Sequence, residues 1–141
     1  MILITDSNIL LSALIRDSIT RKIILDSGWK LYYPQISFRE IISHKNLVLS
    51  KSGMTKREFS FVLSSLLKNV ELIPDEKLKP HLKKAKETIG KTDLDDVAFI
   101  AAAMAVKDSA VWSDDAHFRM QDKIKIFRTK EIIQLFFRSK I

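Results

Sequence analysis

Short apolar runs alternate with longer segments of helical spacing along the whole chain. Runs that are ended by proline or by polar residues are typical of buried parallel strands, and here they cover residues 2–5, 30–33, 70–73, 110–113 and 125–127. The intervening segments repeat their apolar positions every three or four residues, as amphipathic helices do. Five short strands separated by helices predict a three-layer α/β/α fold with a mostly parallel sheet.

Local end signals support these boundaries. Two segments begin with the Ser/Thr-x-x-Glu pattern of a capping box, Ser37 to Glu40 and Thr55 to Glu58. Thr129 stands where it would cap a last helix. In the first unit, Asp6 directly follows the first apolar run and precedes a helical segment. We therefore expect the Asp6 carboxylate at the carboxyl end of the first strand, where open α/β sheets place their ligands.

The segment 75–90 is basic and helical, with an interruption expected at Pro80 and a stop at Gly90. If this segment is one helix, Lys79, Lys83 and Lys86 share one of its faces. The chain as a whole has 24 lysines and arginines against 17 acids, a formal net charge of +7. This excess favours a polyanionic partner, and the three lysines are the predicted RNA-binding surface.

Composition narrows the class of protein. The 141 residues are 46% hydrophobic, with three glycines and three prolines, which predicts a single domain over residues 1–141. The chain has no cysteine, which excludes disulfides and thiolate chemistry and fits a reducing compartment. The first residues do not form a signal peptide, and no apolar stretch is long enough to span a bilayer. A cytoplasmic protein without a membrane partner is expected.

Acidic residues recur at the places where this map ends a strand or begins a helix. They are Asp6, Glu40, the group Asp93, Asp95 and Asp96, and the pair Asp114 and Asp115. Each has a local explanation as a cap, a dipole partner or a polar turn. Two carboxylates about 4 Å apart repel by roughly 4 kcal/mol at a surface-like dielectric. A cluster of them therefore needs protons or a cation, and an oxygen-rich site without cysteine favours Mg²⁺ or Mn²⁺.

The order of these pieces resembles the PIN domain, a family of metal-dependent ribonucleases, over essentially the whole chain. The resemblance rests on Thr5-Asp6-Ser7-Asn8, Arg39-Glu40-Ile41, the run from Asp93 to Ala103, and Val111-Trp112-Ser113-Asp114-Asp115. It implies a PIN-like fold and a ribonuclease that uses Mg²⁺ or Mn²⁺.

The resemblance also implies roles for individual residues. The acidic quartet of the family falls on Asp6, Glu40, Asp96 and Asp115. Asp93 matches an accessory acid, whereas Asn8 and Ser113 match polar positions that help to place the substrate. Because Asp114 and Asp115 are adjacent, either could be the metal ligand. His117 stands where similar sequences often have another acid, and a surface histidine without a function is the simpler interpretation.

Many small PIN proteins are toxins of VapBC-type toxin–antitoxin pairs, and the length of this chain is similar to theirs. The resemblance thus implies an antitoxin partner and a homodimer in addition to RNA. Stand-alone RNA-processing nucleases belong to the same family, so the toxin role stays open here.

Three other functions are compatible with parts of the pattern. A catalytically silent PIN-like module would bind RNA or protein through the same basic balance. A phosphoaspartate receiver domain would need an acceptor after the third strand and an acidic pair at the first, whereas the pair here follows the fourth. A haloacid-dehalogenase-like phosphatase would need a second aspartate where Asn8 stands. The last two fit less well than the nuclease.

Overall fold

Five parallel strands form one sheet in the computed structural model of the chain, which describes residues 1–90 and 94–140. The strands are β1 (Ile2–Thr5), β2 (Lys30–Pro34), β3 (Val70–Ile73), β4 (Ala110–Trp112) and β5 (Ile126–Phe127). Their order across the sheet is β3-β2-β1-β4-β5, and every neighbouring pair is parallel. The predicted three-layer α/β/α fold with a five-stranded parallel sheet is therefore confirmed.

The order of the strands places a switch point between β1 and β4. The chain moves outward from β1 through β2 to β3 and then crosses to the other side of β1. In the register of these two central strands, Thr5 pairs with Trp112, so the residues that follow them emerge side by side. Ligands of open α/β sheets bind outside the carboxyl ends of the strands at such a point.

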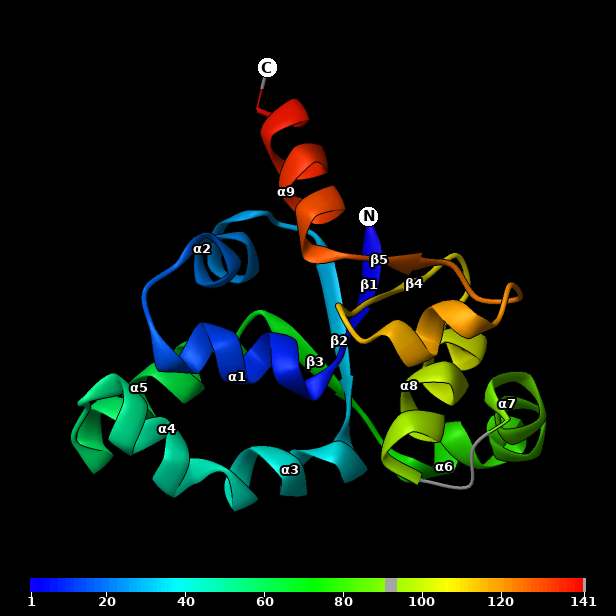
Figure 1. Cartoon of the computed structure of the whole chain (residues 1–141), viewed down its shortest axis with the longest axis horizontal. Coiled ribbons are helices and arrows are strands. Elements are labelled where there is room, and N and C mark those ends of the chain that lie inside the picture. The colour runs from blue at the N-terminus through cyan, green and yellow to red at the C-terminus, as the bar shows by residue number, and fades with distance from the viewer. Residues whose placement is uncertain (91–93, 141) are drawn as a thin grey trace.

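Helices cover both faces of the sheet. They are α1 (Ser7–Ile15), α2 (Ile19–Asp26), α3 (Phe38–Ser43), α4 (Lys45–Ser52), α5 (Lys56–Leu67), α6 (Asp75–Leu78), α7 (Leu82–Ile89), α8 (Leu94–Ala105) and α9 (Thr129–Arg138). Short 3₁₀ turns η1 (Gln35–Ser37), η2 (Lys79–His81) and η3 (Ala116–Met120) link some of them. Figure 1 shows α1, α2, α4 and α5 on one side of the sheet and α6, α7 and α8 on the other.

The core lies where both helical layers meet the central strands. Leu3 and Ile4 in β1 are inaccessible to solvent, as is Trp112 in β4. Burying an aliphatic side chain of this size contributes about 2 kcal/mol, which explains why the central strands read as continuous apolar runs. The alanine-rich α8 is buried from Val97 to Ala103, as its all-round apolar character predicts.

Of the two predicted capping boxes, one is present and the other is not. The Thr55 capping box is present, since Glu58 N donates to Thr55 Oγ1 and Thr55 N donates to the Glu58 carboxylate. The capping box predicted at Ser37 is wrong. Ser37 ends the 3₁₀ turn η1 with helical backbone angles, and its buried hydroxyl has no hydrogen-bond partner. A residue that is already helical cannot bend its side chain back onto the next turn as an N-cap does.

The cap predicted at Thr129 is also wrong. Arg128 is the N-cap residue of α9 and Thr129 is its first helical residue. The orphan N–H of Thr129 instead donates to Asp114 Oδ1 at 2.8 Å, a contact across fifteen residues of sequence. A carboxylate at a helix N-terminus satisfies an unpaired donor and complements the helix dipole.

The basic segment divides at Pro80 as predicted. The helix α6 gives way to the 3₁₀ turn η2, and α7 then runs until Gly90, which has the left-handed conformation of a C-cap. Lys83 and Lys86 share α7, but Lys79 lies in the turn before it. The expected single face of three lysines on one helix is therefore wrong.

Three short elements were not predicted, the helix α4 and the 3₁₀ turns η1 and η3. Every helix among the described residues is too short or too polar to cross a membrane.

Candidate active site

Asp6 lies at the centre of the carboxyl edge of the sheet. It is the N-cap of α1, and its Oδ1 accepts a hydrogen bond from Ile9 N at 2.9 Å. Its backbone N–H donates to Trp112 O, which ties the end of β1 to β4. Only 4% of the residue is exposed. The predicted position of Asp6 after the first strand is therefore found, and its carboxylate is both a helix cap and a buried acid.

Burial raises the pKa of the Asp6 carboxyl to about 6. Hydrogen bonds from Ser113 and from Ile9 oppose this change because they favour the ionised form, whereas the charges of Asp114 and Asp115 add to it. A carboxyl with its pKa near neutrality, held in a water-poor site, is typical of catalytic or metal-binding positions.

Ser113 joins the ends of β1 and β4. Its hydroxyl donates to Asp6 Oδ2 and accepts a hydrogen bond from Asp115 N at 3.0 Å. The Ser113 side chain is inaccessible to solvent, and it contacts Asp6 and Asp115 from the interior of the protein. The fully buried Ser113 hydroxyl thus sets the relative position of Asp6 and the backbone of Asp115.

The two adjacent acids after β4 have different environments. Both oxygens of the Asp114 carboxylate accept from Thr129, one from its N–H at 2.8 Å and one from its hydroxyl at 2.6 Å. Asp115 Oδ1 accepts from His117 N at 2.9 Å, and the imidazole Nδ1 of His117 lies 3.5 Å from the same oxygen. The Asp114 carboxylate therefore binds the start of α9 through both of its oxygens, whereas the Asp115 carboxylate contacts His117 through Oδ1.

Glu40 reaches the site from α3. Its Oε1 accepts a hydrogen bond from Ser7 Oγ at 2.9 Å, and Ser7 Oγ lies 2.6 Å from the hydroxyl of Tyr33. The Tyr33 hydroxyl donates to Ser37 O at 2.7 Å. Burial raises the pKa of Tyr33, so its hydroxyl stays protonated and can act as a donor. A buried pair of hydroxyls therefore connects the start of α1 with the carboxylate of Glu40.

Asp96 lies in the first turn of α8, where it is partly exposed. The neighbouring Asp95 accepts a hydrogen bond from the Arg39 guanidinium at 2.9 Å, in an ion pair that joins α8 to α3. Because Arg39 precedes Glu40 and Asp95 precedes Asp96, this pair brings both candidate acids to the same end of the molecule. Asp93, the predicted accessory acid, lies outside the described residues.

A hollow of about 340 Å³ opens beside Asp114 and Asp115, whereas Asp6, Glu40 and Asp96 do not line it. It is lined by Asn8, Ile9, Ser12, Thr20, Asp114, Asp115 and Thr129. The predicted substrate-positioning residue Asn8 is exposed on its wall, and Asp115 also lines the hollow. Within residues 1–90 and 94–140, no three acids or histidines converge closely enough to form a ready metal cage.

Sequence reasoning missed three contributors to this site. Ser7 contacts Glu40 and His117 contacts Asp115, whereas Tyr33 contacts Ser7. For Ser7 a signal was present, since it directly follows Asp6. For Tyr33 none was available, because an aromatic residue in a buried strand is indistinguishable from any other core side chain.

The chain matches the family model of the PIN domain over residues 4–134. The match begins within β1 and ends within α9, and it includes all the candidate acids. No curated protein is significantly similar to this chain. The chain therefore belongs to the PIN domain family, whose members are generally nucleases that use divalent metal ions.

Proposed function

We propose that this protein is a metal-dependent endoribonuclease whose catalytic acids are Asp6, Glu40, Asp96 and Asp115. The observation that carries the proposal is the buried Asp6 carboxyl, whose pKa is raised to about 6 while Asp115 stands beside it on the neighbouring strand end. Membership of a nuclease family supports the reaction class, and the +7 net charge supports an RNA substrate.

The side chains present suit Mg²⁺ or Mn²⁺. Desolvation and the neighbouring acids oppose ionisation of Asp6, and a divalent cation would remove that penalty. The donors at this edge are oxygens, which hard cations prefer. Asp6, Glu40, Asp96 and Asp115 would hold the ion, with Asp93 as an accessory acid. When bound, such an ion activates water and stabilises the negative charge that develops on the phosphate.

Other residues of the chain act through these acids or on the substrate. Ser113 holds Asp6, and Ser7 holds Glu40, so that the two carboxylates keep a fixed orientation. Asn8 faces the hollow next to Asp115 and would position the RNA by hydrogen bonding. The exposed lysines Lys79, Lys83 and Lys86 would contact phosphates on the side of α7, which packs against η3. We propose that Asp114 mainly stabilises the start of α9 and contributes less to metal binding.

A catalytically silent PIN-like module is the second candidate. It is favoured by the absence of a ready cage of three acids among the described residues. Such a module would bind RNA or protein at the same edge without hydrolysing it.

RNA cleavage separates the two candidates. The wild-type chain is expected to cleave RNA with Mg²⁺ or Mn²⁺, to stop with EDTA, and to stop in Asp6→Asn and Asp96→Asn. Because water is the proposed nucleophile, the products should carry 5′-phosphate and 3′-hydroxyl ends. Cleavage that survives EDTA and both substitutions contradicts the metal mechanism, and a wild type that cleaves no RNA points to the silent module.

For the biological setting we propose a cytoplasmic toxin of a toxin–antitoxin pair that forms homodimers. In α9, Ile132 and Phe136 are buried in the core, whereas Phe137 is 53% exposed. This exposed aromatic ring is the surface we assign to self-association. A monomeric mass in light scattering at high micromolar concentration would exclude the dimer.

A further inference from the structure

Hollows follow the outer face of α1 away from the candidate acids. The hollow at the acids shares Asn8 and Ser12 with a second one of about 380 Å³. The second shares Ile15 and Arg16 with a third of about 670 Å³. Each hollow shares two lining residues with the next, so the three lie next to one another along α1, and together they are here called the α1 groove.

The residues shared between the hollows follow α1. Asn8 and Ser12 are four positions apart and lie on one face of α1, and Arg16 is the C-cap residue at the end of that helix. Eight residues of α-helix rise by about 12 Å, and the third hollow extends the groove beyond the end of that helix. The short polar side chains of Asn8 and Ser12 keep its first half open.

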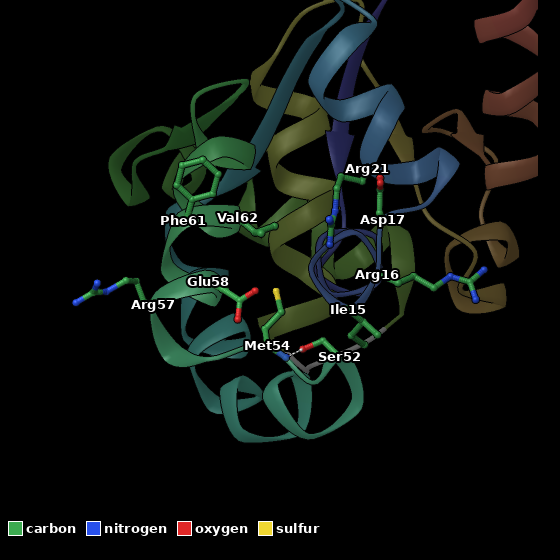
Figure 2. A pocket seen from close by; sticks show the side chains of 10 residues that line it. All are labelled: Ile15, Arg16, Asp17, Arg21, Ser52, Met54, Arg57, Glu58, Phe61 and Val62. Carbon is green, nitrogen blue, oxygen red and sulfur yellow. Dashed lines mark hydrogen bonds between the residues drawn. The ribbon is translucent and has the colours of Figure 1, made fainter.

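The opposite wall comes from α4 and α5. His44, Leu47 and Lys51 line the second hollow, and Arg57 and Phe61 line the third. In Figure 2, Met54 and Val62 point toward the third hollow, while Arg57 and Arg16 extend outward from opposite sides of it. The groove therefore has an apolar floor and cationic rims.

Positive charge predominates in the part of the groove beyond the acids. Arg16, Lys51 and Arg57 are exposed there, against the acids Asp17 and Glu58. The Glu58 carboxylate is engaged by Thr55 N, and that hydrogen bond is the main reason its pKa is lowered. The lowered pKa keeps Glu58 ionised, but the three exposed cations outnumber the two acids, and this excess favours contact with phosphates.

Arg21 adds a further positive charge to the third hollow, although its guanidinium is held in place. It donates to Ala13 O at 2.7 Å and to Leu14 O at 3.2 Å, at the last turn of α1. It therefore contributes a fixed charge near the floor, which favours an anionic occupant.

Two large apolar side chains are exposed beside these cations. Phe61 is 73% exposed and Leu47 is 48% exposed. Aromatic side chains next to a positively charged groove are the combination that binds unpaired bases, because each base can stack on a ring whatever its identity.

We propose that the α1 groove binds the single-stranded RNA that flanks the scissile phosphate, with Arg16, Lys51 and Arg57 on the backbone and Phe61 on a base. This inference rests on the proposed function and names its substrate class. Hollows of this size accept single nucleotides, whereas a duplex keeps its bases stacked inside and cannot offer them to Phe61.

Fluorescence anisotropy in EDTA tests binding without cleavage, with a labelled single-stranded RNA of about 12 nucleotides. The triple variant Arg16→Gln, Lys51→Gln, Arg57→Gln should weaken binding about tenfold or more. It should also reduce the slope of log affinity against log salt by about 2. Phe61→Ala alone should weaken binding about fivefold or more. A duplex of the same sequence should be much less sensitive to Phe61→Ala.

The matched control is Lys30→Gln, Lys68→Gln, Lys107→Gln. These lysines are exposed at or just before the amino ends of β2, β3 and β4, at the edge away from the acids, and the control removes the same charge. Its binding should stay within about twofold of wild type. Equal losses in both triple variants would overturn the proposal, as would unchanged binding in the groove variant.

These experiments distinguish failure of the proposed RNA-binding groove from failure of the proposed nuclease activity. Groove-dependent binding by a wild type that cleaves no RNA supports the groove and contradicts only the proposed hydrolysis. If a groove variant cleaves RNA at the wild-type rate and binds it with the wild-type affinity, the proposed RNA-binding groove is contradicted and the proposed nuclease activity is not. Loss of a protein partner with unchanged RNA affinity in that variant would identify the groove as a protein dock and overturn the proposal.

Discussion

The candidate site has a strand-borne half and a helix-borne half, and they differ in how firmly their acids are held. Asp6 and Ser113 follow adjacent central strands, and both are buried. Glu40 and Asp96 come from α3 and α8 and are partly exposed. The strand-borne half is positioned by backbone pairing in the core, whereas the helix-borne half depends on side-chain contacts such as Ser7 with Glu40.

This difference suggests that the two halves have different roles in metal binding. A buried carboxylate gains most from a cation, because the penalty of its charge is largest there. Partly exposed acids can move apart when no cation is present, which lowers their mutual repulsion. We therefore expect Asp6 to define where a metal ion would bind.

The largest effect is expected for Asp6→Asn. This change keeps the shape but removes the central charge, so RNA cleavage should fall by about 10³-fold or more. Metal-free stability should be equal or higher, because the amide carries no charge to desolvate. Cleavage rates and urea unfolding, each with and without Mg²⁺, measure both. A variant that cleaves within tenfold of wild type would contradict the central role of the strand-borne half.

The pH dependence of metal-free stability should come from the same half. Because the pKa of Asp6 is raised from 3.8 to about 6, the folded state keeps its proton to a higher pH than the unfolded chain. The associated stability is complete below pH 4 and is lost as the pH rises through 6, by about 3 kcal/mol. Urea unfolding in EDTA from pH 4 to pH 7 should show this loss in wild type and not in Asp6→Asn. A parallel profile for both would refute it.

The two adjacent acids should respond in opposite ways. Asp115→Asn should reduce cleavage by about 10²-fold with little change in stability. Asp114→Ala should lower the unfolding free energy by about 1–2 kcal/mol, because α9 loses the acceptor for Thr129, and should reduce cleavage much less. Cleavage rates and thermal unfolding of both variants give the comparison. The reverse pattern would make Asp114 the metal ligand.

The smallest effect tests the helix-borne half. Ser7→Ala removes the hydrogen bond to Glu40, so cleavage should fall about tenfold and the concentration of Mn²⁺ needed for half-maximal binding should rise. Ser43→Ala is the control, because the Ser43 hydroxyl bonds only Glu40 O and His44 nearby. Manganese binding by electron paramagnetic resonance provides a readout besides activity. Equal metal affinity in both variants would show that Ser7 does not orient Glu40.

Local signals were sufficient for most of the elements. The capping box at Thr55 is confirmed because both of its partners lie within one turn, and the stop at Gly90 because glycine adopts the left-handed conformation without strain. The central strands β1 and β4 were predictable from their apolar runs because a parallel strand that is covered on both faces is buried along most of its length. Asp6 was predictable because it stands directly at the end of such a run.

Contacts between distant segments decided the rest. Nothing local distinguishes Asp114 from Asp115, and only the approach of Thr129 engages the first and leaves the second beside Ser113. The contact between Thr129 and Asp114 also explains why the predicted cap at Thr129 is wrong. Ser37 carries the right sequence for a cap, but the preceding 3₁₀ turn already gives it helical angles.

The sequence by itself thus determined the alternation of strands and helices, the family and the acids that belong to the candidate site. The tertiary structure decided which acid is buried, which one caps a helix and which hydroxyls support the others. The physical reason is range: propensity, capping and apolar periodicity act within a few residues, whereas the pKa of Asp6 and the partner of Asp114 depend on groups more than ten residues away.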